Sequence, residues 1–171
     1  KLIKLSVSID SYGLANNFIR YPSKFDFLKR NMLWIKDTPL QVAVSIAFQV
    51  TSMFNLDSFL VWLYDMQHLF RLAGKTLDIQ LQLVKSPSAL NIQHAPIKLK
   101  QRCIEHIKQY HRGNKRLKSA AVLEIRLLHI LKELQKPHVT SQPFVDYVNS
   151  IANTRGLDLH NYLDDWDLIQ D

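Results

Sequence analysis

Three short segments of this chain alternate large aliphatic residues with small or polar ones, and stretches of helical periodicity separate them. Residues 2–9, 41–51 and 77–84 have this period of two, which is typical of β-strands with one apolar face. Between them, residues 23–38 and 55–73 place apolar side chains at helical spacing. The order strand, helix, strand, helix, strand predicts an α/β fold with a parallel sheet and right-handed crossovers.

Each predicted strand keeps one small or polar face. Ser6 and Ser8 lie on this face of the first strand, Ser45 on that of the second and Gln80 on that of the third. Parallel strands covered on both faces usually read as continuous Val, Ile and Leu runs. We therefore expect the polar faces to line a cleft or a barrel lumen, with ligands bound at the carboxyl ends of the strands.

Local signals predict where the helices begin and end. Ser23, followed three residues later by Asp26, resembles a capping box, Asn55 is a plausible N-cap, and Gly74 is a natural helix stop. The chain becomes helical in character after residue 87. Helices are predicted to begin at Pro96 and Pro143, with another from about residue 118 to 135.

The composition excludes several classes of protein. The chain of 171 residues is 47% hydrophobic and 22% charged, which is ordinary for a soluble globular domain. It has neither a signal peptide nor an apolar run long enough for a membrane span, so we expect no membrane contact and a cytoplasmic location. Its one cysteine, Cys103, excludes an internal disulfide and a cysteine-ligated zinc or iron–sulfur site. His106 and Tyr110 share helical spacing with Cys103 but have no carboxylate beside them, so no metal ligands are predicted.

Four segments in sequence order carry a family resemblance. Residues 6–32 (SVSIDSYGLANNFIRYPSKFDFLKRNM) resemble the fourth strand and following helix of radical S-adenosylmethionine (radical SAM) enzymes. Residues 42–63 resemble the fifth strand and helix, and residues 81–103 the sixth strand and the segment after it. Residues 154–166 (TRGLDLHNYLDDW) resemble the carboxyl-terminal end of the twitch-domain subgroup. The resemblance thus covers nearly the whole chain.

The resemblance implies both a fold and an activity. Residues 1–95 would form the carboxyl-terminal half of a βα barrel, and residues 96–171 a helical extension packed on it. The full-length parent would cleave S-adenosylmethionine at a [4Fe-4S] cluster to a 5′-deoxyadenosyl radical, which abstracts hydrogen from a substrate. The CxxxCxxC loop that ligates the cluster is absent from these residues. We therefore expect a part of a longer protein that binds neither cofactor alone and has no activity alone.

The resemblance also implies cofactor-binding residues. Ser8 and Arg20 would contact the methionyl carboxylate of S-adenosylmethionine, because a hydroxyl and a guanidinium supply charge-assisted hydrogen bonds. Asp10 and Gln49 would face cofactor or substrate near the ends of the strands. The structural alternative is that Asp10 and Ser11 cap the turn before residue 13 and that Arg20 pairs with a surface carboxylate.

A half barrel would also expose the backbone edge of its first strand, residues 2–9, and exposed edges invite pairing. We therefore expect the isolated chain to associate with itself through this edge.

A basic stretch supports a different class of function, a small interaction domain for nucleic acid or protein. Residues 98–136 hold eleven Lys or Arg against three Glu, and Tyr110 is a candidate platform for base stacking. The same charges could instead pair with the acidic residues that follow residue 157. The candidate phosphate contacts are Lys108, Arg112, Lys115, Arg116 and Lys118.

Overall fold

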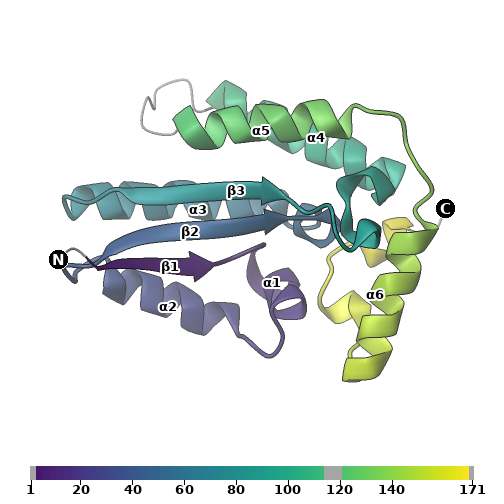
Figure 1. The fold of residues 1–171 in the computed structure, drawn as a ribbon, viewed down its shortest axis with the longest axis horizontal. Coiled ribbons are helices and arrows are strands. Elements are labelled where there is room, and N and C mark those ends of the chain that lie inside the picture. The colour runs from purple at the N-terminus through teal and green to yellow at the C-terminus, as the bar shows by residue number, and fades with distance from the viewer. Residues whose placement is uncertain (1–2, 114–120, 170–171) are drawn as a thin grey trace.

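A three-stranded parallel sheet forms the centre of the computed structural model, which describes residues 3–113 and 121–169 (Figure 1). The strands β1 (Lys4–Ser8), β2 (Gln41–Phe48) and β3 (Leu77–Leu83) lie side by side in this order. The crossover helices are α2 (Phe25–Ile35) and α3 (Leu56–Leu72). The predicted α/β fold and its order of elements are confirmed.

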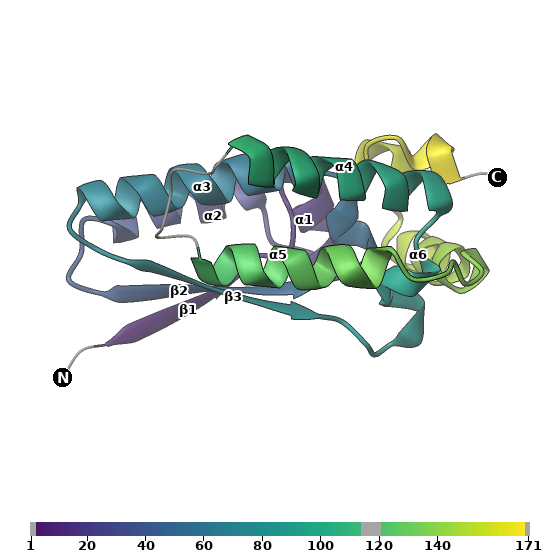
Figure 2. The same ribbon diagram turned by 90° about the horizontal axis from the view of Figure 1, so that it is seen from above.

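Within the described residues, helices cover only one face of this sheet (Figure 2). In Figure 2, α2 and α3 form a layer on one side of the strands, and none of the labelled helices lies across the other side. The register places Ser8 beside Ser45 and Ser45 beside Gln80 on the uncovered face. Ser8 and Gln80 are exposed there, whereas Val44 and Ile79, which point toward the helices, are buried. The polar face expected from the alternation is therefore open.

The ends of α3 follow the sequence signals. Asn55 is the N-cap residue, as predicted, but its side chain makes no capping hydrogen bond and donates to Asp164 Oδ2 at 2.6 Å. At the other end Gly74 has a φ of +73°, the left-handed conformation that glycine adopts at low cost. The Gly74 N–H donates to the carbonyl of Arg71, and the Lys75 N–H donates to the carbonyl of Phe70. These two bonds form a Schellman motif, which satisfies two carbonyls that the last turn of the helix would otherwise leave unpaired.

The segment between β1 and α2 differs from the prediction. Residues expected to form only a polar turn contain the helix α1 (Gly13–Ile19). The capping box predicted at Ser23 is wrong, because α2 begins at Phe25 with Lys24 as its N-cap residue and no cap from Lys24's own side chain. The Phe25 N–H donates instead to Asn17 Oδ1 at 2.6 Å. A side chain from the preceding helix thus takes over the role of the local cap.

Three helices and several short 3-10 segments make up the remainder. The helix α4 (Ile97–Gly113) begins directly after Pro96, as predicted. The helix α6 (Gln142–Arg155) has Pro143 in its first turn, also as predicted. The helix α5 (Ala121–Leu134) ends close to the predicted place, whereas the predicted start near residue 118 lies outside the described residues. The 3-10 segments are Val50–Met53 (η1), Ser88–Leu90 (η2), Ile92–His94 (η3), Leu159–Asn161 (η5) and Trp166–Ile169 (η6).

One hydrophobic core joins the sheet to the carboxyl-terminal helices. Phe48 of β2, Phe59 of α3, Leu127 of α5 and Phe144 of α6 are all almost fully buried and belong to the same cluster. The helix α5 lies along the free edge of β3, and α4 packs between α5 and α3. The elements after residue 95 therefore contribute to the same core as the sheet.

None of the helices in the described ranges is both long and apolar enough to cross a lipid bilayer.

Candidate functional site

A buried carboxylate organises the carboxyl end of the first two strands. Asp10, just after β1, is only 2% exposed. Its Oδ1 accepts the backbone N–H of Ala47 at 2.7 Å, and its Oδ2 accepts the Arg20 Nε–H at 2.6 Å. Charge-assisted bonds of this kind are roughly twice as strong as neutral ones. Asp10 thus ties the end of β1 to β2 and to the end of α1.

The turn after β1 is held by an amide from α1. Asn16 Oδ1 accepts the backbone N–H groups of Asp10 at 3.0 Å and Ser11 at 3.4 Å. The expectation that the side chains of Asp10 and Ser11 cap this turn is therefore wrong. Asn16 is fully buried and was not singled out, because its role depends on the helix α1, which the sequence reading missed.

Three buried polar atoms near these strand ends lack a hydrogen-bond partner within the described residues. They are Ser11 Oγ, Asn16 Nδ2 and Thr51 Oγ1. Asn16 belongs to α1 and Thr51 to η1, and these two elements are in contact. A buried polar group without a partner costs about 1–3 kcal/mol. Such atoms are typical of places where a protein exchanges hydrogen bonds with water or with a polar ligand.

The four residues predicted to bind the cofactor have different environments. Asp10 and Arg20 are in direct contact, and Gln49 is buried at the end of β2 with its N–H donating to Ser52 Oγ at 3.3 Å. Ser8 lies on the open face of the sheet. The Arg20 side chain is 37% exposed, and its carboxylate partner is the buried Asp10, not a surface carboxylate as the structural alternative had it.

The two cofactors implied by the resemblance differ in how well these residues suit them. Cys103 is completely buried in α4, and burial raises the pKa of its thiol, so it is not an available thiolate. In the described ranges, no group of three or more His, Cys, Asp or Glu side chains is placed to hold a metal ion. The residues therefore do not suit an iron–sulfur cluster. The partly exposed guanidinium of Arg20 could pair with a small anionic group, whereas the hydroxyls of Ser11 and Thr51 are buried.

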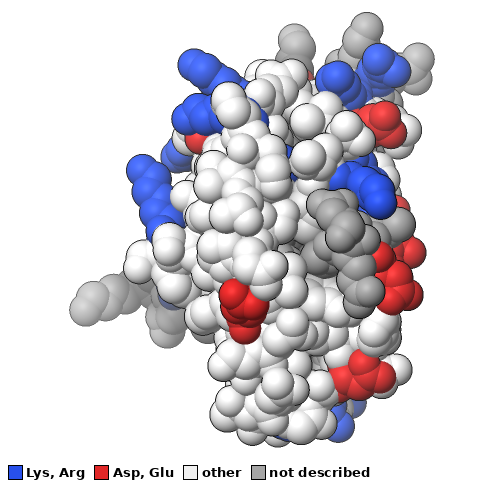
Figure 3. Space-filling model, turned by 90° about the vertical axis from the view of Figure 1, so that its right-hand side faces the viewer, with Lys and Arg blue, Asp and Glu red and all other residues white. Residues whose placement is uncertain are grey.

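The carboxyl-terminal segment braces the helix that carries Arg20. Arg155 Nη1, at the end of α6, donates to the Phe18 carbonyl at 2.6 Å, and its guanidinium lies over the rings of Phe18 and Tyr21. Figure 3, which views the side of the molecule where α6 lies, shows a largely uncharged surface with one acidic group within it, further acidic side chains on the right and basic side chains toward the top. Residues far apart in sequence therefore support one wall of the site.

The basic residues proposed to contact nucleic acid are only partly described. Lys108 and Arg112 are exposed one helical turn apart on α4, whereas Lys115, Arg116 and Lys118 lie outside the described residues. The ring of Tyr110 is half-buried, and this burial raises the pKa of its enclosed hydroxyl, so it presents less surface for stacking than expected. Pairing with the acidic tail occurs at Arg102, which donates to Asp165.

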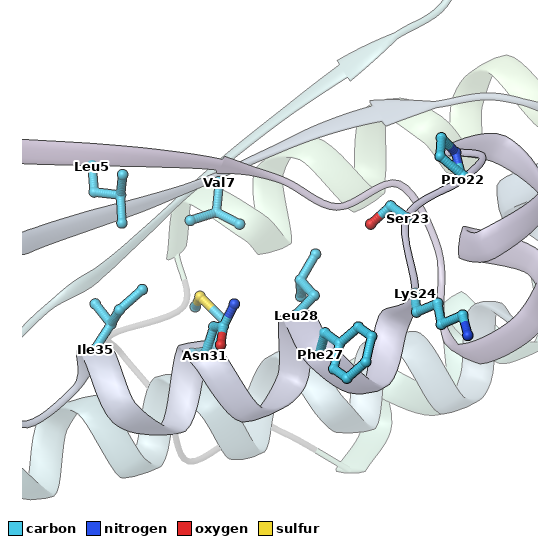
Figure 4. A pocket seen from close by; sticks show the side chains of 10 residues that line it. Leu5, Val7, Pro22, Ser23, Lys24, Phe27, Leu28, Asn31 and Ile35 are labelled. Carbon is cyan, nitrogen blue, oxygen red and sulfur yellow. The ribbon is translucent and has the colours of Figure 1, made fainter.

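An apolar groove runs along the free edge of β1 (Figure 4). It has a volume of about 510 Å³ and lies between β1 and α2. Leu5 points from the strand toward Ile35 of the helix, and Val7 points toward Asn31 and Leu28 (Figure 4). Both strand residues are only partly buried, although the equivalent positions of β2 are fully buried. The helix-facing side of β1 is thus incompletely covered.

Comparison of the chain with protein families, with curated proteins and with solved structures found no match.

Proposed function

We propose that this chain is the carboxyl-terminal half of a twitch-type radical SAM barrel. In the parent protein it would help to bind S-adenosylmethionine for cleavage to a 5′-deoxyadenosyl radical and hydrogen abstraction from a substrate. Further strands of the parent would pair with β1 and complete the barrel around the polar face of the sheet. A cytoplasmic location is part of this proposal.

The incomplete covering of β1 is the observation that carries the proposal. Among the described elements β1 pairs only with β2, so its other edge presents unpaired backbone groups. Beside this edge, Leu5 and Val7 face the groove on α2. A further strand and helix would satisfy the backbone and bury these side chains together. The uncovered Ser8, Ser45 and Gln80 would then face the lumen.

The residues at the strand ends have distinct roles in this proposal. Arg20, oriented by Asp10, offers its remaining N–H groups to the methionyl carboxylate of S-adenosylmethionine. Ser8 lies two residues before Asp10, on the face of the sheet that would line the lumen. Gln49 and Thr51 follow β2 at the same end of the sheet and provide polar atoms for the rest of the ligand. The cluster and its cysteine ligands would come from the other half of the barrel.

Binding of S-adenosylmethionine to the chain tests the proposal directly. The resemblance implied that the chain alone binds no cofactor, but the Asp10–Arg20 pair leads us to expect weak binding by the half of the site that is present. An NMR titration should then shift amide signals of Ser8, Asp10 and Gln49. Ser8→Ala should weaken binding, whereas Ser6→Ala, two residues earlier on the same exposed face, should leave it unchanged. Shifts confined to other parts of the chain would contradict the assignment.

Anaerobic iron–sulfur reconstitution provides an independent test. Because the only thiol of the chain is buried, we expect no stoichiometric cluster and no cleavage of S-adenosylmethionine by the chain alone. A stoichiometric cluster with turnover would overturn the division of roles between the two halves.

Nucleic-acid binding is the second candidate, favoured by the exposed Lys108 and Arg112 on one face of α4. Contacts to phosphates release counterions, so such binding should weaken steeply with salt, by several decades for six or more contacts. Lys108→Gln with Arg112→Gln should reduce the slope by about two. Affinity that is unchanged by salt would exclude this candidate.

A further inference from the structure

A second pocket, independent of the site at Asp10, lies at the opposite edge of the sheet. It has a volume of about 440 Å³ and is bounded by the carboxyl-terminal part of β3, the residue Lys85 after it, and one face of α5. Among the described strands β3 pairs only with β2, and α5 flanks its free edge. The pocket thus opens at the carboxyl end of a parallel strand, the end of such sheets where ligands bind.

The charge of this pocket is predominantly positive. Lys85 and Arg126 line it, are exposed, and have no acidic partner in the described part of the chain. The one carboxylate in the lining, Glu133, is already engaged. It lies 2.7 Å from Lys136 Nζ and accepts from Gln93 Nε2 at 3.4 Å, and the hydrogen bond from Lys136 is the main reason that its pKa is lowered. The charge of Glu133 is therefore offset locally, and Lys85 and Arg126 remain available to an anion.

The rest of the lining is mixed, with polar Gln82, Asn91 and His129 beside apolar Leu81, Leu83, Val84, Ile92 and Ile130. Leu81, Ile92 and Ile130 come from β3, η3 and α5, and all three are at most 5% exposed. The position of Arg126 four residues before Ile130 puts the guanidinium and the apolar side chain on the same face of α5. A pocket that combines cations with apolar lining residues suits a ligand that has an anionic group on an apolar body.

We propose that this pocket binds the phosphoryl group of a small phosphate monoester. Arg126 and Lys85 would pair with the phosphoryl oxygens, since a guanidinium matches that geometry with two parallel N–H bonds. The apolar part of the ester would lie against Leu83 and Val84, which line the pocket and are only partly buried. This site does not depend on radical chemistry, and its test is separate from binding at Asp10.

Titration with phenyl phosphate, followed by NMR of the full chain, tests the proposal. We expect amide shifts in residues 81–85 and along α5, and roughly tenfold or greater weakening in Arg126→Gln, which corresponds to the loss of one charge-assisted interaction. Lys132→Gln is the matched control, since it removes the same charge from an exposed residue of α5 outside the pocket lining, and it should leave the affinity unchanged. Both side chains are exposed, so neither variant should affect folding.

Several results would overturn the proposal. An absence of shifts at millimolar phenyl phosphate would do so, as would equal weakening by Arg126→Gln and Lys132→Gln, which would indicate a general effect of charge. Inorganic phosphate that binds as tightly as phenyl phosphate would reveal a site for the free ion and exclude recognition of the ester. An oligonucleotide that displaces phenyl phosphate and loses affinity steeply with salt would assign the pocket to nucleic acid.

Discussion

At the scale of single residues, two buried charged groups have very different environments. Asp10 is satisfied by a guanidinium and a backbone N–H. Lys100 on α4 is 5% exposed, and its Nζ has no hydrogen-bond partner among the described residues. Burial lowers the pKa of Lys100, because removal from water disfavours the charged form. The first group stabilises the fold, whereas the second opposes it.

We predict that Lys100→Met stabilises the protein at pH 7 by roughly 1–2 kcal/mol, because an apolar side chain removes an unsatisfied buried amine. Between the lowered pKa of folded Lys100 and its ordinary value, the unfolded chain binds more protons, so the stability of the unmodified protein rises with pH there. The advantage of methionine should therefore shrink in alkaline solution. Urea denaturation across this range measures it, and Lys98→Met, at an exposed position of α4, should change little at any pH.

Asp10→Asn should destabilise the protein by roughly 1–3 kcal/mol, since it weakens two hydrogen bonds to a buried carboxylate. Asp78→Asn is the control at the other end of the sheet. Asp78 pairs with Lys4 at 3.1 Å, but both side chains are about half exposed, and such pairs contribute about 0.2–1 kcal/mol or less. Equal losses of stability in thermal unfolding would show that Asp10 has no special structural role.

At the scale of the elements, a left-handed residue ends α3 and directs the chain into β3. A Cβ at Gly74 would meet no atom within 4 Å, so any cost of substitution comes from its backbone conformation. We predict that Gly74→Ala lowers the free energy of unfolding by roughly 1–2 kcal/mol. Gly74→Asn should cost less, because asparagine tolerates this conformation. Chemical denaturation compares the two variants, and an alanine variant as stable as the unmodified protein would contradict the role of this glycine.

At the scale of the whole molecule, the two edges of the sheet differ in how they are covered. The helix α5 flanks β3, whereas β1 adjoins an open apolar groove. Ile3 O accepts the Gln41 N–H, and the Ile9 N–H donates to Ser45 O, so the odd-numbered residues of this strand pair with β2. The even-numbered residues therefore direct their N–H groups toward the free edge.

This geometry predicts that isolated chains associate through β1. Two copies related by a twofold axis would pair their edges and bring the two grooves together. Light scattering should show a mass that increases with concentration. Ser6→Pro removes an N–H from the free edge without loss of a bond to β2, so it should give a monomer, whereas Ser6→Ala should still associate. A monomer at all concentrations for the unmodified chain would contradict this interface.

The sequence was sufficient for the three strands, the longer helices and their order, because periods of 2 and 3.6 residues are properties of neighbouring residues. The alternation at residues 41–51 and the cap at Asn55 are legible without knowledge of the fold, as is the polar side of each strand. The short helix α1 was missed, because its seven residues make only about two turns and include the polar pair Asn16 and Asn17.

The candidate site could be predicted only in part for a related physical reason. Asp10 and Arg20 lie ten residues apart, and the resemblance selected both, but Asp10 also bonds to the N–H of Ala47, 37 residues away. Arg155 reaches Phe18 across 137 residues, and Gln93 reaches Glu133 across 40. Such contacts depend on how elements pack, which no local spacing encodes. Strand and helix periodicity therefore came from the sequence, whereas the partners of each buried polar group came from the packed core.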